Sequence, residues 1–188
     1  MVRYEQSRRQ QFLSEAEGYL DLLAGLSGRD EFEMPVRTRL AARALDVLKR
    51  LARESSWRRG HVLFLQGQAM RMCERYPEAI TSLVEASQLD PENLHVWLAL
   101  GWCYKRTDRL DLAVQSLEEA LAIEPDEAIV HYNLACYWSL ANNPLLAVAY
   151  LARAFDLDSN YRDLVGDESD FAPIRNHPDF LALTTVIV

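Results

Sequence analysis

Small and apolar residues recur at intervals of 34 positions between residues 60 and 161. The aligned positions are Gly67, Gly101 and Ala135; Ala79, Ala113 and Ala147; Leu83, Leu117 and Leu151; Ala86, Ala120 and Ala154; and Leu89, Ile123 and Leu157. A period of this length is typical of a solenoid, in which each repeat buries its apolar face only against its neighbours. The sequence therefore predicts three stacked repeats of one supersecondary unit.

The residue types at these positions indicate how the unit folds. Apolar residues at three- and four-residue spacing predict two helices in each repeat. Glycine or alanine lets the two backbones cross closely, because a larger side chain would overpack the contact. Pro91 and Pro125 are also one period apart and are expected to end the second helices. Proline cannot continue a helix and disfavours helical geometry in the residue before it.

The second repeat carries the most complete motif. Trp97, Leu100, Gly101 and Tyr104 fall on its first helix, Ala113, Leu117 and Ala120 on its second, and Pro125 follows. This arrangement resembles the tetratricopeptide repeat. The resemblance implies an all-α fold, a right-handed superhelix of antiparallel helix pairs, with repeats over residues 60–93, 94–127 and 128–161.

Residues 1–59 are predicted to form a helical hairpin that caps the array. Apolar residues at helical spacing indicate one helix over residues 4–24 and a second from Pro35 to about Glu54. The pair looks like a degenerate repeat with a lengthened loop, in which Gly18, Ala41 and Leu45 are the expected packing positions.

Residues 162–188 are too few for a fourth repeat and are predicted to form a C-terminal cap. An array exposes an apolar face at each end, and that face has to be covered. The pattern Asp167-x-x-Asp170-Phe171-x-x-Ile174 resembles a closing segment of bacterial tetratricopeptide proteins. The residues expected to cover the last helix of the third repeat are Phe171, Ile174, Phe180 and Leu181.

Charge and hydropathy exclude several classes of partner. Residues 1–59 carry 12 basic and 9 acidic side chains, a net of +3, and the other residues carry 8 basic and 19 acidic, a net of −11. An acidic body repels phosphate backbones, so nucleic acid is not expected. No run of about 18 apolar residues predicts a membrane span. The first residues lack the apolar core of a signal peptide, so we expect a cytoplasmic protein without a membrane partner.

The family resemblance implies that the first helices of the repeats line a groove for a protein or peptide partner. The residues that it nominates for contact are Phe64, Gln68, Arg71, Leu98, Trp102, Lys105, Arg106, Tyr132 and Asn133. Trp102 with Phe64, Leu98 and Tyr132 would form an aromatic, apolar floor of the kind found in binding hot spots. The alternative is that the tail or the N-terminal hairpin covers this floor.

Basic residues repeat with the same period. Arg71 and Lys105 are one period apart, as are Arg75 and Arg109, and Arg106 is adjacent to Lys105. An acidic partner segment would use these cations for orientation. The alternative is that they only meet the negative ends of helix macrodipoles, which needs no ligand.

One specialised partner is not expected. Members of the family that bind the acidic C-termini of heat-shock chaperones use a clamp of lysine, asparagine and arginine side chains. The corresponding positions here hold Phe64, Gln68, Ala99, Ile129 and Asn133, which do not form that clamp.

No pattern in the sequence predicts catalysis. The four histidines form no H-x-x-x-H or H-E-x-x-H motif, and no cysteine lies at ligand spacing from them. The three cysteines lie in apolar stretches and are expected to be buried hydrophobes. No glycine-rich phosphate loop and no G-x-S-x-G occurs. We therefore expect no enzyme, no cofactor and no metal.

The sequence thus predicts a non-catalytic interaction module whose groove binds an apolar, partly acidic segment. One alternative is a small secretion-type chaperone. The other is a self-assembling scaffold, a homo-oligomer whose groove is occupied by its own segments.

Overall fold

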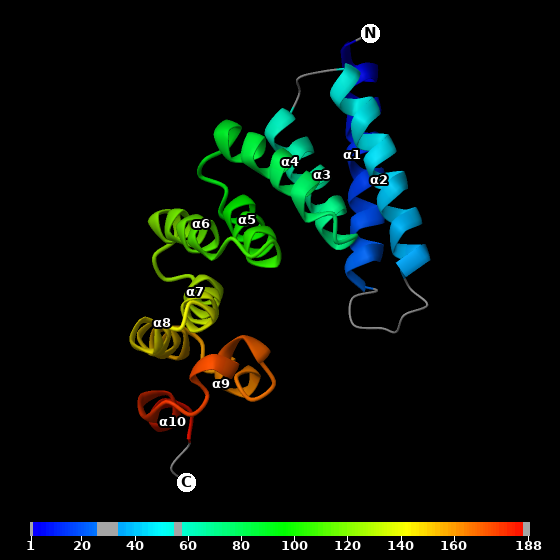
Figure 1. Cartoon of the computed structure of the whole chain (residues 1–188). Helices are drawn as coiled ribbons and strands as arrows, with labels where there is room; N and C mark the ends of the chain where they lie inside the picture. The colour runs from blue at the N-terminus through cyan, green and yellow to red at the C-terminus, as the bar shows by residue number, and fades with distance from the viewer. Residues whose placement is uncertain (1, 26–33, 55–57, 186–188) are drawn as a thin grey trace. The chain divides into compact units, whose positions relative to one another are not determined.

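The computed structural model describes residues 2–25, 34–54 and 58–185, which form helices joined by turns, with no strand among them (Figure 1). The elements are α1 (Val2–Gly25), α2 (Met34–Glu54), α3 (Arg59–Met72), α4 (Tyr76–Leu89), α5 (Leu94–Arg106), α6 (Leu110–Ile123), α7 (Ala128–Leu140), α8 (Pro144–Leu157), α9 (Tyr161–Leu164), the 3-10 helix η2 (Ser169–Ile174) and α10 (Pro178–Thr184). This arrangement confirms the all-α fold predicted from the period of the sequence.

Helix ends repeat with the same period as the small and apolar residues. The second helices α4, α6 and α8 begin at Tyr76, Leu110 and Pro144, so that each start lies one period after the previous one. The first helices α3, α5 and α7 end at Met72, Arg106 and Leu140, with the same spacing. The small-residue positions therefore recur at the same place in successive helix pairs.

The turn between the two helices of each repeat has the same backbone geometry. Glu74, Asp108 and Asn142 have φ of 60°, 59° and 56°, in the left-handed region that side chains disfavour. In the third repeat the Asn143 side chain accepts a hydrogen bond from the Leu146 N–H. This bond identifies Asn143 as the cap of the helix that Pro144 opens.

The chain divides into two compact units, residues 1–103 and residues 104–188. We call them the N-terminal unit and the C-terminal unit. The division lies within α5, so α3, α4 and most of α5 belong to the first unit.

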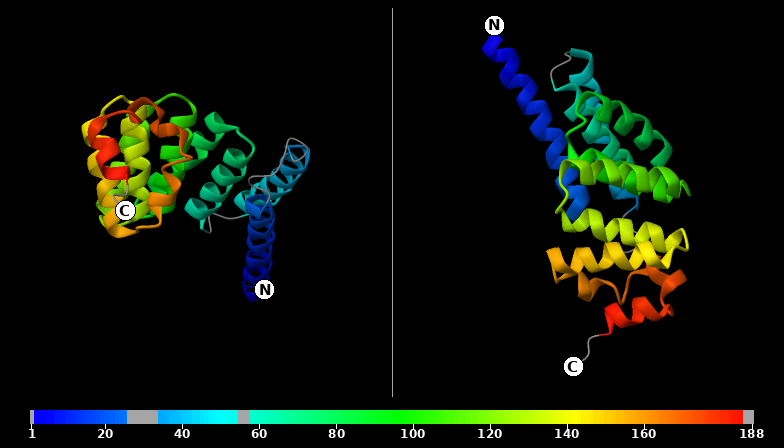
Figure 2. Two further views of the ribbon diagram at one scale, coloured as in Figure 1. Left: turned by 90° about the horizontal axis from the view of Figure 1, so that it is seen from below. Right: turned by 90° about the vertical axis from the view of Figure 1, so that its left-hand side faces the viewer.

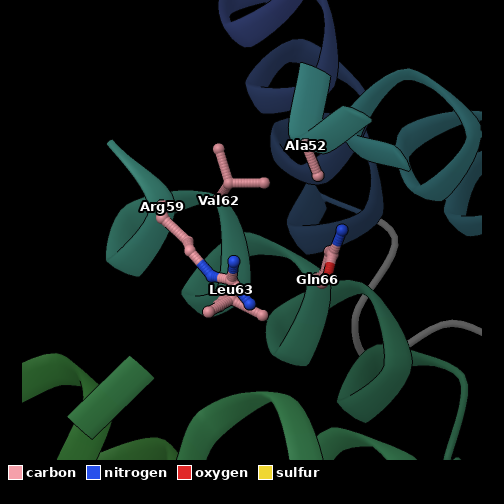
Figure 3. A pocket seen from close by; sticks show the side chains of 5 residues that line it. All are labelled: Ala52, Arg59, Val62, Leu63 and Gln66. Carbon is pink, nitrogen blue, oxygen red and sulfur yellow. The ribbon is translucent and has the colours of Figure 1, made fainter. Parts of the chain in front are cut away.

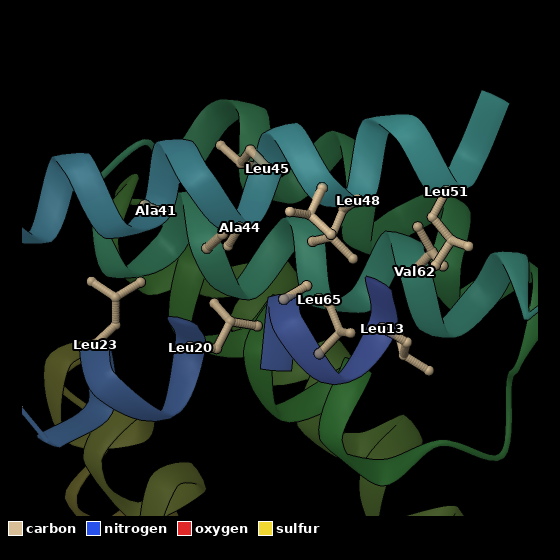
Figure 4. Packing of buried hydrophobic residues seen from close by; sticks show 13 residues of the cluster. Leu13, Leu20, Leu23, Ala41, Ala44, Leu45, Leu48, Leu51, Val62 and Leu65 are labelled. Carbon is tan, nitrogen blue, oxygen red and sulfur yellow. The ribbon is translucent and has the colours of Figure 1, made fainter. Parts of the chain in front are cut away.

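In the N-terminal unit, α1, α2 and α3 enclose an aliphatic core (Figure 4). Leu13, Leu48 and Leu51 are fully buried there. The predicted packing role of Gly18 is wrong, because a Cβ added at this glycine would meet no atom within 4 Å. Ala41 and Leu45 are buried as expected.

At Gly67 the backbone of α3 lies against a side chain of α4. A Cβ added there would lie 2.5 Å from Cγ of Leu83 and 2.7 Å from its Cδ2. These distances are shorter than any relaxed carbon contact, so only glycine fits. The contact explains why a small residue occupies this place in the period.

In the C-terminal unit, the tail runs along the last helix pair (Figure 2). The segment η2 packs on α7 and α10 packs on α8. Phe171, Ile174 and Phe180 are buried, as the sequence predicts. Leu181 is 46% exposed, so its predicted part in the cap is wrong. On the short helix α10, Phe180 takes the inward position and the next residue has to face outward.

Within the described residues, no helix has the length and apolar character needed to cross a membrane.

Candidate functional site

The residues predicted to contact a partner lie at equivalent places on the first helices. Phe64, Leu98 and Tyr132 are related by the repeat period on α3, α5 and α7. The same period relates three residues one helical turn later, Gln68, Trp102 and Cys136, and also Arg71, Lys105 and Ser139. We call the side of each helix that carries these positions its first-helix face.

In the N-terminal unit this face is partly open. Phe64 and Leu98 are half-buried, Phe64 because it packs against the core that α1, α2 and α3 share, and Trp102 is 38% exposed. Arg71 Nε donates a hydrogen bond of 2.8 Å to Oε1 of Gln68, which orients both side chains along α3. The unit thus presents aromatic and aliphatic surface next to a guanidinium group.

In the C-terminal unit the tail covers the equivalent face. Tyr132 is only 5% exposed. Its ring centroid lies 4.8 Å from that of Tyr161 and 5.8 Å from that of Phe171, the latter in an edge-on arrangement. Asn133, the neighbour of Tyr132, is half-buried. Internal cover, the alternative raised from the sequence, therefore applies to this repeat.

A charged contact fixes the tail beside these rings. Lys105 forms an ion pair with Asp170, whose side chain is 13% exposed. Ser139 Oγ donates a hydrogen bond of 2.7 Å to the Asp170 carbonyl. The Lys105 ammonium also lies 5.9 Å from the centroid of the Tyr137 ring. An acidic residue followed by an aromatic one, Asp170 and Phe171, thus occupies the face of α7.

The other basic residues of the predicted rim have intramolecular contacts. Arg75 Nε donates to Oε1 of Glu78 at 3.1 Å. Hydrogen bonding by the Glu78 backbone N–H, and then by Arg75, lowers the pKa of the Glu78 carboxyl. Arg109 lies 5.1 Å above the Tyr104 ring, and Arg106 is exposed in the last turn of α5. Most of the predicted basic rim therefore stabilises the helix pairs themselves.

His131 has a structural role that could not be predicted from its being a histidine. Its Nε2 lies 2.8 Å from the carbonyl oxygen of Pro125. The indole N–H of Trp97, the equivalent residue one repeat earlier, donates to the Pro91 carbonyl at the same distance of 2.8 Å. A tryptophan and a histidine thus make one contact that joins a repeat to the end of the helix before it.

The cysteines do not have the properties of nucleophiles. Cys103 and Cys136 are buried, whereas Cys73 is half-buried, which corrects the expectation for that residue. Burial raises the pKa of the Cys73 thiol, and it raises the pKa of the Cys103 thiol to about 11. Burial, and then the charges of Glu168 and Asp170, raises the pKa of the Cys136 thiol still further above its ordinary value. All three thiols are therefore protonated and weakly nucleophilic near neutral pH.

A small pocket in the N-terminal unit lies between the end of α2 and the start of α3 (Figure 3). Its volume is about 150 Å³, and its lining residues are Ala52, Arg59, Val62, Leu63 and Gln66. Ligand pockets are usually at least twice as large. Arg59, its charged lining residue, is already paired with Glu85, so this pocket is a poor candidate for a ligand site.

Comparison with known proteins assigns the repeats. Residues 74–135 match the family model for the tetratricopeptide repeat. These residues are tetratricopeptide repeat sequence. No curated protein sequence matched the chain.

Solved structures with the same tetratricopeptide fold are similar over most of this chain. A structure of MamA AMB-1 is 22% identical, with a TM-score of 0.60, over 88% of this chain and 99% of the MamA chain. One of MamA MSR-1 is 23% identical, with a TM-score of 0.59, over 81% of this chain and 95% of the other. MamA 41-end from Desulfovibrio magneticus RS-1 is 14% identical, with a TM-score of 0.59, over 84% and 95%. At these identities the likeness concerns the fold.

Sequence reasoning missed how the tail contacts the first-helix face. Asp170 follows its partners Lys105 and Ser139 at intervals of 65 and 31 positions, and neither interval is a multiple of the period. The acidic and aromatic residues of the tail were the sequence signal for a cap, but they carried no information about which helix the tail packs on.

Proposed function

We propose that this protein is a non-catalytic interaction module, and that the first-helix face of its N-terminal unit binds an apolar, partly acidic peptide segment. Tetratricopeptide repeats are typically interaction modules of this kind. The residues proposed to contact the partner are Phe64, Gln68, Arg71, Leu98 and Trp102. Arg106 and Asn133 stay predictions as further contacts, while Lys105 and Tyr132 contact the tail.

The observation that carries the proposal is the cap on α7. There the first-helix face accommodates a peptide segment of the same chain, with Asp170 on a lysine and Phe171 on a tyrosine. The equivalent positions on α5 are Leu98 and Trp102, which present apolar surface. The positive group at the corresponding place on α3 is Arg71. A partner with an acidic residue beside an aromatic or aliphatic one would match this chemistry.

Trp102 provides the decisive test. Large aromatic side chains at the centre of an interface commonly contribute about 2 kcal/mol or more, so Trp102→Ala should weaken binding about 30-fold or more. We would use wild-type protein, Trp102→Ala and Leu145→Ala as baits on one extract of the native host and quantify the captured proteins. Leu145 is 69% exposed on α8, the second helix of the third repeat, and serves as the matched control.

Specific partners should be retained by the wild type and by Leu145→Ala and lost by Trp102→Ala. If all three baits retain every captured protein equally, the first-helix face of α5 is not the binding surface.

A self-assembling scaffold is the second candidate, because the tail already occupies the face of α7. It predicts a solution mass above that of one 21.6 kDa chain. A light-scattering mass equal to the monomer at all concentrations would eliminate this candidate and leave the first proposal intact.

A further inference from the structure

Three potential metal ligands meet where the tail packs on α7. The Cys136 thiol and the carboxylates of Glu168 and Asp170 each bring one ligand atom into a group in which all atoms lie within 4.8 Å of one another. Cys136 comes from α7, whereas the two acidic residues come from the tail, at the start of η2. The sequence offered no spacing by which to find this group.

A fourth polar group lies on the face of α7 that carries Cys136. Tyr132 precedes Cys136 by one helical turn on α7, so both side chains lie on one face of that helix. The Tyr132 hydroxyl is buried and has no hydrogen-bond partner. Burial, and then the charges of Cys136, Glu168, Asp170 and Tyr161, raises the pKa of this phenol. A buried hydroxyl without a partner is costly unless something binds there.

Hydrogen bonds hold the Glu168 carboxylate and the backbone that carries the two acidic residues. Glu168 Oε1 accepts from the Asp170 N–H at 3.1 Å, and the Glu168 carbonyl accepts from Arg175 Nη2 at 2.7 Å. Ser139 Oγ binds the Asp170 carbonyl, as described above. Such bonds orient ligands before an ion arrives, which is the usual role of groups around a metal site.

We propose that Cys136, Glu168 and Asp170 bind one zinc ion, with the Tyr132 hydroxyl as a fourth oxygen donor or as the hydrogen-bond partner of a bound water. A thiolate ligand excludes the harder Mg²⁺ and Ca²⁺, which prefer oxygen alone, whereas Zn²⁺ accepts sulfur and carboxylate together. The thiol proton leaves to solvent when sulfur binds. Three ligand charges then face the two charges of the ion.

When no metal is bound, the Lys105 ammonium balances the negative charge of the Asp170 carboxylate. Zinc would replace Lys105 as the partner of the Asp170 carboxylate. The Lys105 ammonium would remain at the Tyr137 ring, which it already approaches. The ion would join α7 directly to the tail and so hold the cap on the last repeat.

Zinc binding to the full chain tests this proposal. Reduced, chelator-treated protein would be titrated with zinc chloride in a calorimeter, and the metal retained after gel filtration would be measured by elemental analysis. We expect one zinc per chain. Cys136→Ser should weaken binding at least about 100-fold, the upper end of what loss of a supporting group costs. Cys103→Ser, a buried cysteine in the other unit, should leave the affinity unchanged.

Cobalt(II) provides an independent readout, because a cobalt–thiolate bond absorbs in the near ultraviolet. The band should appear in the wild type and in Cys103→Ser and be missing in Cys136→Ser. If Cys136→Ser alters the circular dichroism spectrum, Glu168→Gln replaces it, since the amide oxygen can still accept from the Asp170 N–H. Lys105→Met should strengthen binding by removing the competing charge.

Two results would overturn the site: no zinc retained by the wild type, or equal zinc affinity in the wild type and in the ligand variants. The second result would assign any binding to acidic groups at the surface. Neither result bears on the peptide-binding face of the N-terminal unit.

Discussion

Gly67 shows how one missing side chain sets the distance between two helices. Its backbone lies against Leu83, a fully buried residue of α4. Because the clash of an added Cβ is with the branch point Cγ, rotation about the Cβ–Cγ bond of the leucine would not relieve it, and rotation about its Cα–Cβ bond would need free space around a side chain that is fully buried. One methyl group would therefore have to push the two backbones apart.

We predict that Gly67→Ala lowers the free energy of unfolding by about 1–3 kcal/mol, the usual cost of overpacking a core. Urea denaturation followed by circular dichroism measures the change. Gly18→Ala is the matched control, since space is open around it in α1 and alanine favours a helix by about 0.5–1 kcal/mol. A neutral Gly67→Ala would show that α4 is free to move away.

Trp97 and His131 illustrate a residue-level equivalence that sequence comparison does not reveal. The two side chains share neither size nor charge, yet each provides a ring nitrogen 2.8 Å from the carbonyl oxygen of the proline that precedes its helix. Their place in the period was predictable. The shared hydrogen bond was not, because it depends on where the ring nitrogen lies.

At the scale of the element, the turns between paired helices carry a repeated backbone strain. Glu74, Asp108 and Asn142 all adopt positive φ, but only asparagine and, to a lesser degree, aspartate tolerate that region well. The first repeat therefore has the least suitable residue at this turn.

Glu74→Gly should stabilise the protein by about 0.5–1 kcal/mol, because relief of left-handed strain exceeds the added entropy of the unfolded chain. Thermal unfolding measures it as a higher Tm. Asn142→Gly should change the Tm little. Equal effects at both turns would mean that the gain does not come from φ.

The cap is held to α7 and α8 by three buried side chains, of which Phe171 is fully enclosed between Tyr132 and Phe180. If the Phe171 ring were removed, Tyr132 and Phe180 could not fill the space that it leaves, since each already packs on another element.

Phe171→Ala should lower the free energy of unfolding by about 3–5 kcal/mol. Urea titration measures the loss, and hydrogen exchange would locate it in η2 and α10. Leu181→Ala, in the same tail but 46% exposed, should cost much less. Similar losses from both variants would contradict the packing described for the tail.

For the whole molecule, the sequence pattern within each repeat predicted most of the fold but little of how the first-helix faces are covered or exposed. Helix ends, turns and small-residue contacts follow from interactions within a single repeat, and the sequence displays them three times. The cover over Tyr132 depends on a tail that belongs to no repeat. Trp102 on α5 and Tyr132 on α7 occupy repeat positions that are one helical turn apart. Only the structure shows that Trp102 is exposed and Tyr132 enclosed.

The tail contacts the first helix of the last repeat as well as the second, through Asp170 on Ser139 and Phe171 on Tyr132, and it also pairs with Lys105 at the end of α5. An engineer who lengthens this array therefore cannot add a consensus unit between α8 and the cap. The new terminal repeat would lack the tyrosine and serine that the tail contacts, and Lys105 on α5 would lie one repeat further from the tail. Additional units have to enter upstream of α5, and α5 and the last repeat have to be transplanted together with the tail as a single cassette.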